Sequence, residues 1–244
     1  MMSARAEYRE QVAGRRTRRA MTKARSTKPP GAGDFVPATH RISRLRVAAA
    51  TCQGCDLFRR ATQTVFGEGP PAARLMLVGE TPGDQEDLAG HPFVGAAGRL
   101  LDELLAEAGI DRKKTYVTNA VKHFKWEPRG KRRLHAKPSS REIAACRPWL
   151  DAEIDSIEPA LIVCLGATAA QALLGRQFRI TRQRGKILPG DGGSAILATY
   201  HPAAVLRAPG DAARHAMRGE MLSDLRKVAD WLAKSERGKA AAVR

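Results

Sequence analysis

Four short apolar runs, each followed by a polar turn, constrain this chain more than any other feature of its sequence. The runs are RLMLVG at 74–79, TYVTNAV at 115–121, LIVCL at 161–165 and AILAT at 195–199. Continuous apolar runs of this length are typical of strands that are buried on both faces of a parallel sheet. Segments with helical spacing of apolar residues separate them. The alternation predicts an α/β fold with three layers, α/β/α, around a central, mainly parallel four-stranded sheet.

The chain of 244 residues is expected to hold one such domain, at residues 39–235. Residues 1–38 carry many Arg and Lys and few large apolar side chains, so we expect a disordered basic arm there. Residues 236–244 are expected to form a short, disordered basic tail. About two hundred residues remain, which is enough for one α/β domain with its own core.

Hydropathy argues against a membrane protein. No run of about eighteen apolar residues occurs, so no membrane-spanning segment is expected. The N-terminus lacks the apolar segment of a secretory signal. Its Arg-rich, acid-poor composition also resembles a transit peptide, which is the less favoured interpretation beside an arm that tethers nucleic acid.

The formal net charge of +17 is concentrated in two stretches. Residues 1–30 carry nine Lys or Arg against two Glu, and residues 122–141 carry eight against one. Together they hold fourteen of the seventeen excess charges, so the rest of the chain is expected to be near neutral. A focused positive field favours a polyanionic partner, and nucleic acid is the commonest one.

Four cysteines in a chain without an export signal indicate a metal or cluster site rather than disulfides. Cys52 and Cys55 form a C-x2-C pair in a predicted loop. Cys164 lies in the middle of a predicted strand, where a cysteine acts as a small hydrophobic residue. The predicted ligands are therefore Cys52, Cys55, His123 and Cys146, and both zinc and an iron–sulfur cluster accept such a mixed set. The alternative for His123 is a surface histidine with no ligand role.

Polar side chains follow the predicted strands, where the carboxyl ends of a parallel sheet would bring them together. Glu80 follows the first strand, Asn119 ends the second, and His201 follows the fourth. Glu80 is a candidate for positioning a water or a histidine. His201, fixed by Pro202, is a candidate for stabilising an oxyanion or donating a proton, although a lone His-Pro pair is equally compatible with no special role.

Four carboxylates lie close together at Glu80, Asp84, Glu86 and Asp87. Converging carboxylates can hold a divalent metal, but the sequence offers no supporting ligand elsewhere. We therefore interpret this segment as a solvated acidic turn.

A long cationic loop is expected between the second strand and a helix that begins at Ser139 or Ser140. Loops of this length are more often functional than passive. His135 lies within it, in RGKRRLHAKPS, and the surrounding cations are expected to disfavour the imidazolium and leave a neutral, nucleophilic ring. The alternative is a DNA-contacting loop whose histidine has no special role.

Taken together, these motifs resemble the uracil-DNA glycosylase superfamily. They are GETPGDQED, HPFVGAAGRLLDELL, VTNAVKHFKW, CRPWL, LIVCLGATAAQALLG and YHPAAVLR, in this order across roughly residues 48–232. They are most similar to the iron–sulfur branch, which implies a 4Fe–4S cluster on the four predicted ligands. Two features, His123 in place of a cysteine and the inserted KRRLH loop, resemble the UdgX type, whose members bond covalently to uracil-containing DNA.

The resemblance implies a role for each main candidate. His135 would be the nucleophile that attacks deoxyribose C1′, so that the enzyme becomes crosslinked to DNA after a single turnover. His201 would stabilise charge on the departing uracil, and Glu80 would orient His135 or the sugar. Phe93 would stack on the flipped base, and Asn119 would bind its pyrimidine edge.

The resemblance also implies further contacts with the substrate. Gly79, Thr81 and Asp84 would bind the nucleotide, although Thr81 stands where the UdgX pattern has glutamine, a departure that bears on uracil specificity. Single-stranded DNA is the preferred partner we expect, and the protein is expected to be a monomer in the bacterial cytoplasm that acts at the nucleoid. The cations that would bind DNA are Lys131, Arg132, Arg133, Lys137 and Arg207.

Two other functions compete with covalent capture. A conventional iron–sulfur uracil-DNA glycosylase would release uracil and turn over, and His135 within the KRRLH loop argues against it. A non-catalytic, cluster-bearing DNA-binding protein would explain the charge, but it would not require Glu80, Asn119 and His201 at strand ends.

Overall fold

A parallel sheet forms the centre of the molecule in the computed structural model, which describes residues 31–242. The strands β1 (Leu75–Gly79), β2 (Thr115–Asn119), β5 (Leu161–Leu165) and β7 (Ala195–Thr199) lie in the order β2-β1-β5-β7. All four are parallel, and their residues are almost entirely buried. The predicted α/β fold with a mainly parallel sheet is confirmed, and the four predicted strands occupy their expected positions.

A fifth strand was not predicted. Strand β6 (Ile187–Pro189) pairs antiparallel with β7 at the edge of the sheet. It has only three residues and ends in proline, which an edge strand tolerates because one of its sides needs no ladder hydrogen bonds. So short a segment carries too little apolar periodicity to be found from sequence.

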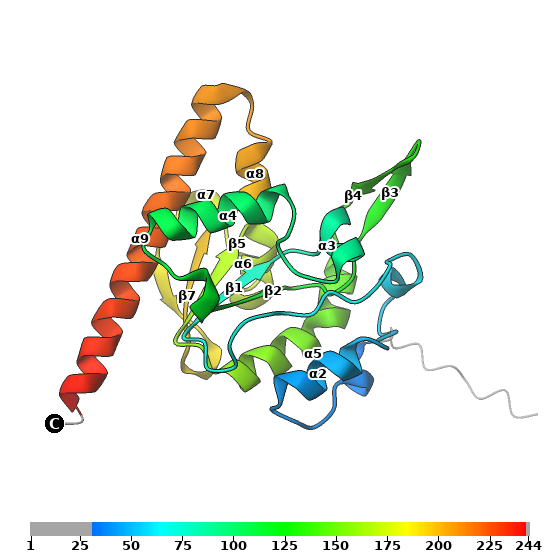
Figure 1. Ribbon diagram of the computed structural model, residues 1–244, viewed down its shortest axis with the longest axis horizontal. Helices are drawn as coiled ribbons and strands as arrows, with labels where there is room; N and C mark the ends of the chain where they lie inside the picture. Colours follow the sequence, from blue (N-terminus) through cyan, green and yellow to red (C-terminus); the bar gives the residue numbers. More distant parts are fainter. Residues whose placement is uncertain (1–30, 243–244) are drawn as a thin grey trace, which may run out of the picture.

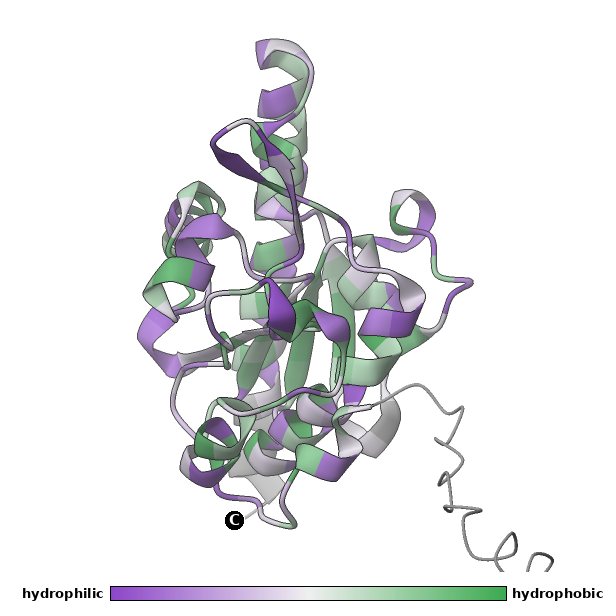
Figure 2. Ribbon diagram, turned by 90° about the vertical axis from the view of Figure 1, so that its right-hand side faces the viewer, coloured by the Kyte–Doolittle hydropathy of each residue, from purple (hydrophilic) through white to green (hydrophobic). Residues whose placement is uncertain are grey.

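Helices cover both faces of the sheet, which completes the three predicted layers (Figure 1). On one face, α4 (Ala96–Glu107), α8 (Pro202–Leu206) and α9 (Gly210–Ala242) pack on one another and on the sheet. On the other face, α5 (Ser140–Ile157) and α6 (Ala167–Leu174) bury a second apolar cluster. The strands appear as the most hydrophobic ribbons, enclosed by these helices (Figure 2).

A third apolar cluster joins α5 to α2 (Ile42–Ala49) and to the short 3-10 helices η1 (Ala32–Phe35) and η2 (Asp56–Arg59). Trp149 of α5 is fully buried in it, and its ring meets Phe66 edge to face. Ser139 caps α5 and accepts from the Glu142 amide, as the sequence predicts. This cluster contains the predicted cysteine ligands.

The expected domain limits differ from the structure at both ends. Residues 32–38 were assigned to the disordered arm, yet η1 packs against α5 and Ala32 is buried. Residues 236–242 were assigned to a disordered tail, yet they continue α9 as far as Ala242. The remaining expectations for the arm and the tail concern residues 1–30 and 243–244, which lie outside the described residues.

The segment expected to be one long cationic loop is partly a β-hairpin. Strand β3 (Trp126–Arg129) pairs antiparallel with β4 (Arg132–His135), and the hairpin projects from the body of the molecule (Figure 1). Likewise, the expected acidic turn after β1 is mostly helix α3 (Asp84–Ala89). In the remaining parts, 3-10 helices η3 (Arg112–Lys114) and η4 (Asp191–Gly193) precede β2 and β7, and α7 (Ile180–Gln183) precedes β6. Among the described residues, no helix is long and apolar enough to cross a membrane.

Candidate active site

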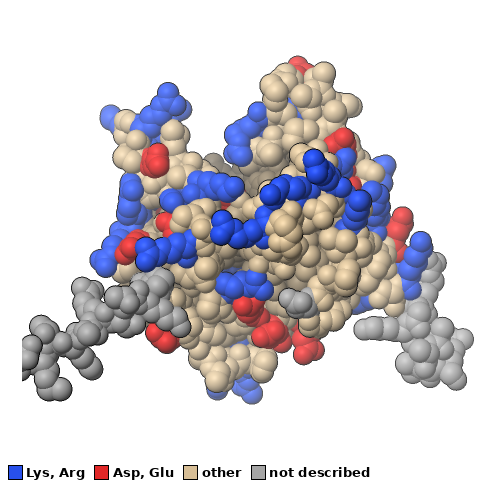
Figure 3. Space-filling view, turned by 180° about the vertical axis from the view of Figure 1, so that it is seen from behind, with Lys and Arg blue, Asp and Glu red and all other residues tan. Residues whose placement is uncertain are grey.

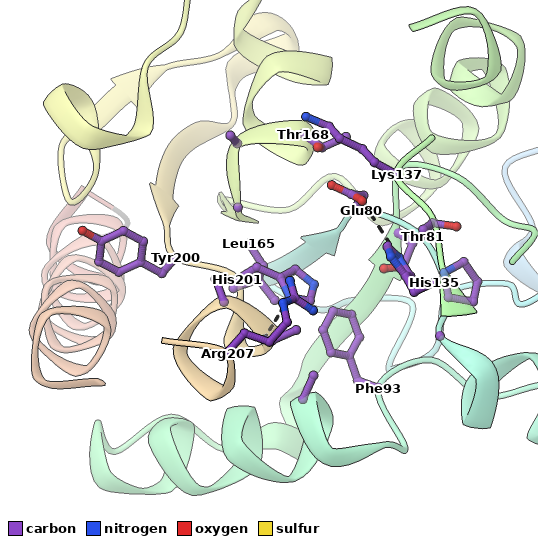
Figure 4. Close-up of a pocket in the computed structure, with 18 of the residues that line it drawn as sticks. Glu80, Thr81, Phe93, His135, Lys137, Leu165, Thr168, Tyr200, His201 and Arg207 are labelled. Carbon is purple, nitrogen blue, oxygen red and sulfur yellow. Dashed lines mark hydrogen bonds and ion pairs between the residues drawn. The ribbon is translucent and has the colours of Figure 1, made fainter. Parts of the chain in front are cut away.

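A cavity of about 750 Å³ opens at the carboxyl ends of the parallel strands. Ligands bind at this edge in open α/β folds because the strand ends present loops and helix starts to one crevice. Glu80 and Thr81 follow β1, Asn119 ends β2, and His201 follows β7. His135, the last residue of β4 in the hairpin, also lines the cavity. The predicted catalytic residues His135, Glu80 and His201 are therefore brought together in one pocket (Figure 4).

His135 and Glu80 face one another across the pocket. The imidazole Nε2 lies 3.9 Å from a carboxylate oxygen of Glu80, and the two side chains point toward each other (Figure 4). The pKa of His135 is lowered from its usual value, chiefly by burial and also by the charge of Arg207, while Glu80 opposes the shift. The predicted direction is confirmed, but the stated cause is wrong, because burial and Arg207 lower the pKa rather than the cations of the hairpin.

His201 has a defined tautomer. Its Nδ1 accepts a hydrogen bond from the Ala203 amide, at 3.1 Å, and so caps the start of α8. A neutral ring with Nδ1 as acceptor carries its proton on Nε2. Burial, together with the charges of Arg207 and His135, lowers the pKa of His201 to about 4. The ring is thus a neutral Nε2–H donor at neutral pH.

Phe93 lies on the floor of the pocket in a strained conformation. It has φ of 59°, in the left-handed region, and its ring is stacked on His201 with centroids 6.1 Å apart. Gly98 permits this, because a Cβ at Gly98 would meet the Phe93 carbonyl oxygen at 1.7 Å. Such strain is retained where it positions a functional side chain.

Asn119 lies beside Phe93, and Gly79 makes room for both. A Cβ at Gly79 would lie 2.3 Å from Oδ1 of Asn119 and 2.6 Å from Cζ of Phe93. Gly79 itself is not among the residues that line the cavity, so its role in substrate binding, as predicted, is indirect. The Asn119 side-chain amide lines the cavity and makes no hydrogen bond within residues 31–242. It is therefore available to a ligand.

Two other predicted substrate contacts differ from expectation. Thr81 lines the cavity, but its hydroxyl donates to the His123 carbonyl at 2.8 Å. Asp84 does not line the cavity, because its carboxylate accepts from Nε of Arg133 at 2.6 Å. Helix α3 turns this side chain toward the hairpin, and a direct substrate contact by Asp84 stays a prediction.

Arg133 fastens the hairpin to helix α3. Besides Asp84, its guanidinium binds the fully buried carboxylate of Asp87 at 2.7 Å. It also lies against the rings of Phe124 and Trp126. Arg133 was predicted to bind DNA, but these contacts occupy it within the protein. Its effect is to hold β4, and hence His135, over the pocket.

The other predicted DNA-binding cations are exposed. Lys137 and Arg207 line the cavity, while Lys131 and Arg132 lie at the hairpin turn. Among the side chains that the structure describes, no carboxylate lies within salt-bridge distance of these four cations. Lys and Arg side chains form a band across the face seen from behind, below a hollow between two projecting parts (Figure 3).

The acidic segment is not a solvated turn. Glu86 accepts from the Gly83 and Gly95 amides, which ties the start of α3 to the start of α4. Asp87 accepts from the Thr62 amide as well as from Arg133. The interpretation as a solvated acidic turn is therefore wrong, because two of its carboxylates are buried structural acceptors.

The three predicted cysteine ligands lie in or against the third apolar cluster. Cys52, Cys146 and His123 are buried and Cys55 is half-buried. The thiols of Cys52 and Cys55 are close enough to Cys146 to raise its pKa, together with burial, which is the main cause. His123 is only 5% exposed, so the surface alternative for it is wrong.

The N–H groups around the cysteines of the third apolar cluster suit metal-bound thiolates. The Trp149 indole donates to Sγ of Cys52 at 3.1 Å, and the Lys122 amide donates to Sγ of Cys146 at 3.3 Å. Hydrogen bonds to sulfur of this kind stabilise thiolate ligands. Within residues 31–242, no three His, Cys, Asp or Glu side chains are already arranged around a metal position, and the His123 Nε2 instead contacts the Thr64 hydroxyl. Cys164 is buried in β5, as its core interpretation predicts.

A buried ion pair lies between the third apolar cluster and the pocket. Lys122 and Glu153 are both fully buried and hydrogen-bonded to each other. The Lys122 ammonium also donates to the Asn119 carbonyl at 2.7 Å. Glu153 accepts from the Tyr116 hydroxyl and the Gly67 amide, so both charges are saturated. Sequence reasoning missed this pair, because neither residue type predicts burial.

Several pocket residues were also missed. The end of β5 contributes Leu165, the segment after it contributes Gly166 and Thr168, and α7 contributes Ile180. Glu80 and Asn119 were predicted because they lie at the carboxyl ends of parallel strands. The same reasoning applies to the end of β5, so the sequence could have indicated these residues. No signal in the sequence places Ile180 there.

Comparison with known proteins agrees with this arrangement. The family model described as the uracil DNA glycosylase superfamily matches residues 66–226. A protein named type-4 uracil-DNA glycosylase from Thermotoga maritima is 39% identical over 184 residues, covering 75% of this chain and 90% of the relative. Its namesake from Archaeoglobus fulgidus is 38% identical over 193 residues, covering 76% and 90%. A type-5 uracil-DNA glycosylase from Pyrobaculum aerophilum is 26% identical over 147 residues, covering 53% and 61%. With a pocket of this composition at the strand ends and a match across most of the domain, the chain belongs to the uracil-DNA glycosylase superfamily.

Proposed function

We propose that this protein excises uracil from DNA and is then joined covalently, through His135, to C1′ of the deoxyribose it has exposed. The observation that carries the proposal is the position of the His135 Nε2, 3.9 Å from Glu80 and in the same pocket as His201. Relatives named uracil-DNA glycosylase support the first step. The placement of His135 supports the second.

Base recognition would depend on Phe93 and Asn119. A flipped uracil would stack on the Phe93 ring, and the unoccupied amide of Asn119 would bind its O4 and N3–H edge. Cytosine carries an amino group where uracil has O4, so one amide orientation cannot suit both bases. Thr81, whose hydroxyl already binds the His123 carbonyl, contributes shape to the pocket rather than a strong hydrogen bond.

Glycosidic bond cleavage leaves charge on both fragments. The electron pair of the C1′–N1 bond departs with uracil, and the charge spreads to its O2. The neutral Nε2–H of His201 is suited to donate to this oxygen, because its proton is fixed on Nε2 by the Ala203 contact. The Glu80 carboxylate would stabilise the cation-like sugar from the other side of the pocket.

Capture of the sugar would follow from the neutral state of His135. The lone pair on Nε2 forms the new bond to C1′, and the proton on Nδ1 passes to solvent or to the departed uracil. A lowered pKa keeps this lone pair available at neutral pH. A tethered imidazole competes strongly with water because its effective concentration is very high.

The second candidate is a conventional glycosylase in which water attacks C1′ and the enzyme turns over. The names of the relatives favour it, since both of those compared over most of their length are called type-4 uracil-DNA glycosylases. It requires no role for His135.

We also propose that Cys52, Cys55, Cys146 and His123 hold a 4Fe–4S cluster. The hydrogen bonds that Trp149 and Lys122 donate to two of the sulfurs support this assignment. A bound cluster would link the loop after α2, the segment after β2 and α5. Its contribution would be structural, since the cluster region lies behind the pocket wall.

The test uses a labelled single-stranded oligonucleotide with one deoxyuridine, followed by boiling in detergent and a denaturing gel. We expect a uracil-dependent, boiling-resistant shifted band for the wild-type protein, which His135→Ala abolishes and the exposed-histidine control His215→Ala retains. Uracil release without any shifted band would establish the conventional enzyme. Neither product, with intact DNA affinity, would remove the glycosylase assignment altogether.

A further inference from the structure

A second basic surface, separate from the hairpin, lies around helix α7. Between residues 159 and 190 the chain contains five Arg or Lys and no Asp or Glu. The five are Arg176, Arg179, Arg182, Arg184 and Lys186. The charge outside residues 1–30 and 122–141 sums to near neutral, as predicted, but it is unevenly distributed, and this segment concentrates positive charge.

Four of these cations remain available to a ligand. Arg184 is committed to the protein, because it pairs with Asp224 and Glu220. Arg176, Arg182 and Lys186 are exposed, and none of them forms a salt bridge with a carboxylate whose side chain the structure describes. Arg179 is also exposed, and its guanidinium binds only backbone carbonyls, of Arg176 and Phe178, so its charge is not neutralised.

The α7 surface borders the pocket. Ile180, between Arg179 and Arg182, lines the cavity together with Thr168 of α6. Lys137, which follows the hairpin, also lines the cavity, and its side chain extends toward Thr168 (Figure 4). A strand whose nucleotide occupies the cavity therefore passes close both to Lys137, next to the hairpin, and to the α7 segment.

We propose that Arg176, Arg182 and Lys186, with Arg179, form a second DNA-binding surface that holds the strand flanking the flipped nucleotide on one side of the pocket. This rests on the proposed function in one respect, namely that the bound strand enters the pocket. Phosphates spaced along a single strand match several exposed cations that lack carboxylate partners, and binding of this kind is electrostatic and independent of sequence. The hairpin then holds the other flank.

The test compares two triple variants. Arg176→Gln, Arg182→Gln and Lys186→Gln form the α7 variant. The control is Lys113→Gln, Lys114→Gln and Lys234→Gln, which removes three exposed cations near the amino ends of the strands, away from the pocket. Both variants carry the same net charge, so a general effect of charge cancels in the comparison.

Affinity for single-stranded DNA is measured against salt concentration, with the deoxyuridine near the 5′ end or near the 3′ end. Each phosphate contact contributes about 0.7 to the logarithmic salt slope of a single strand, so losing three lowers the slope by about 2. We expect this loss for the α7 variant with one of the two oligonucleotides, and the wild-type slope for the control variant with both.

Two results would overturn the proposal. One is an α7 variant whose salt slopes match those of the control variant. The other is an equal loss for both deoxyuridine positions and for DNA without uracil, because the surface would then attract DNA without holding a defined flank. Failure of the proposed function is recognised separately, by absence of uracil release from either oligonucleotide with the wild-type protein.

Discussion

The guanidinium of Arg133 binds the buried carboxylate of Asp87 at 2.7 Å, and this pair joins the β3–β4 hairpin to helix α3. Asp87 is fully buried, so its charge depends on Arg133 and on the Thr62 amide. Arg133→Met should lower the free energy of unfolding by about 3 kcal/mol, because a buried carboxylate loses its cation. It should also slow crosslinking more than uracil release, since His135 would be held less firmly.

The matched control is the neighbouring Arg132→Met, whose side chain is exposed. It should change stability by no more than about 0.5 kcal/mol. Denaturant unfolding and single-turnover gels measure the two effects. Equal behaviour of the two variants would show that Arg133 does not fasten the hairpin.

Gly79 should not tolerate alanine. The added Cβ would lie 2.3 Å from Oδ1 of Asn119, so either the amide or the Phe93 ring must move. We expect Gly79→Ala to reduce the rate of uracil release at least tenfold while the protein stays folded. Gly219→Ala serves as control, because nothing lies within 4 Å of its Cβ and alanine favours a helix. Wild-type rates for Gly79→Ala would contradict the proposed placement of the base.

Asn119→Asp should change base preference. A carboxylate accepts hydrogen bonds but cannot donate one to O4 of uracil, whereas it can accept from the amino group of cytosine. We expect slower release of uracil and detectable release of cytosine, measured on matched oligonucleotides. Release of uracil at the wild-type rate, with no release of cytosine, would indicate that Asn119 does not contact the pyrimidine edge.

The rate of uracil release should resist acid. Burial lowers the pKa of His201 to about 4, so the ring stays neutral, with Nε2–H as donor, well below the pH at which an ordinary histidine titrates. We expect a constant rate from about pH 8 to about pH 6 and a fall as the pH approaches 4. The measurement is best made in His135→Ala, which removes the neighbouring imidazole. A midpoint near 6.5 would contradict a buried, neutral His201.

The same shift makes folding sensitive to acid. A histidine whose pKa is lower in the folded than in the unfolded state favours unfolding once it is protonated. Its full contribution to stability is therefore present above about pH 6.5 and is lost as the pH falls toward 4. His201→Gln should weaken this acid dependence.

The Lys122–Glu153 pair should be costly to break on one side only. Glu153→Gln leaves the buried ammonium without its counter-charge and should destabilise the fold by about 3 to 5 kcal/mol. Adding Lys122→Met should recover part of this, but not all, because the Tyr116 hydroxyl and the Gly67 amide have lost a charged acceptor. Urea unfolding of both variants tests this, and an additive double variant would contradict direct coupling.

The sequence predicted what depends on local pattern. Apolar runs located all four parallel strands, and strand ends located Glu80, Asn119 and His201, because parallel strands bring their carboxyl ends to one edge. Cys164 was assigned to the core from its position within an apolar run, and the structure buries it.

What the sequence did not predict depends on contacts between distant segments. Arg133 was predicted to bind DNA and Asp84 to bind the substrate, yet they bind each other. The sequence does not show which partner a charged side chain will have in the folded protein. The burial of Asp87 and of Lys122 follows from partners 46 and 31 residues away. The hairpin was expected as a loop because its two four-residue strands are polar and exposed.

The hairpin contributes no strand to the five-stranded sheet and no residue to the three apolar clusters. Its attachment depends on side-chain contacts with the body of the protein, chiefly those of Arg133 with Asp84 and Asp87. Inserting or deleting the hairpin would change which side chain reaches the deoxyribose, while the residues at the floor of the pocket would stay in place to bind the base. A self-consuming enzyme and one that turns over could thus share one scaffold and be exchanged by evolution or design through a single short module.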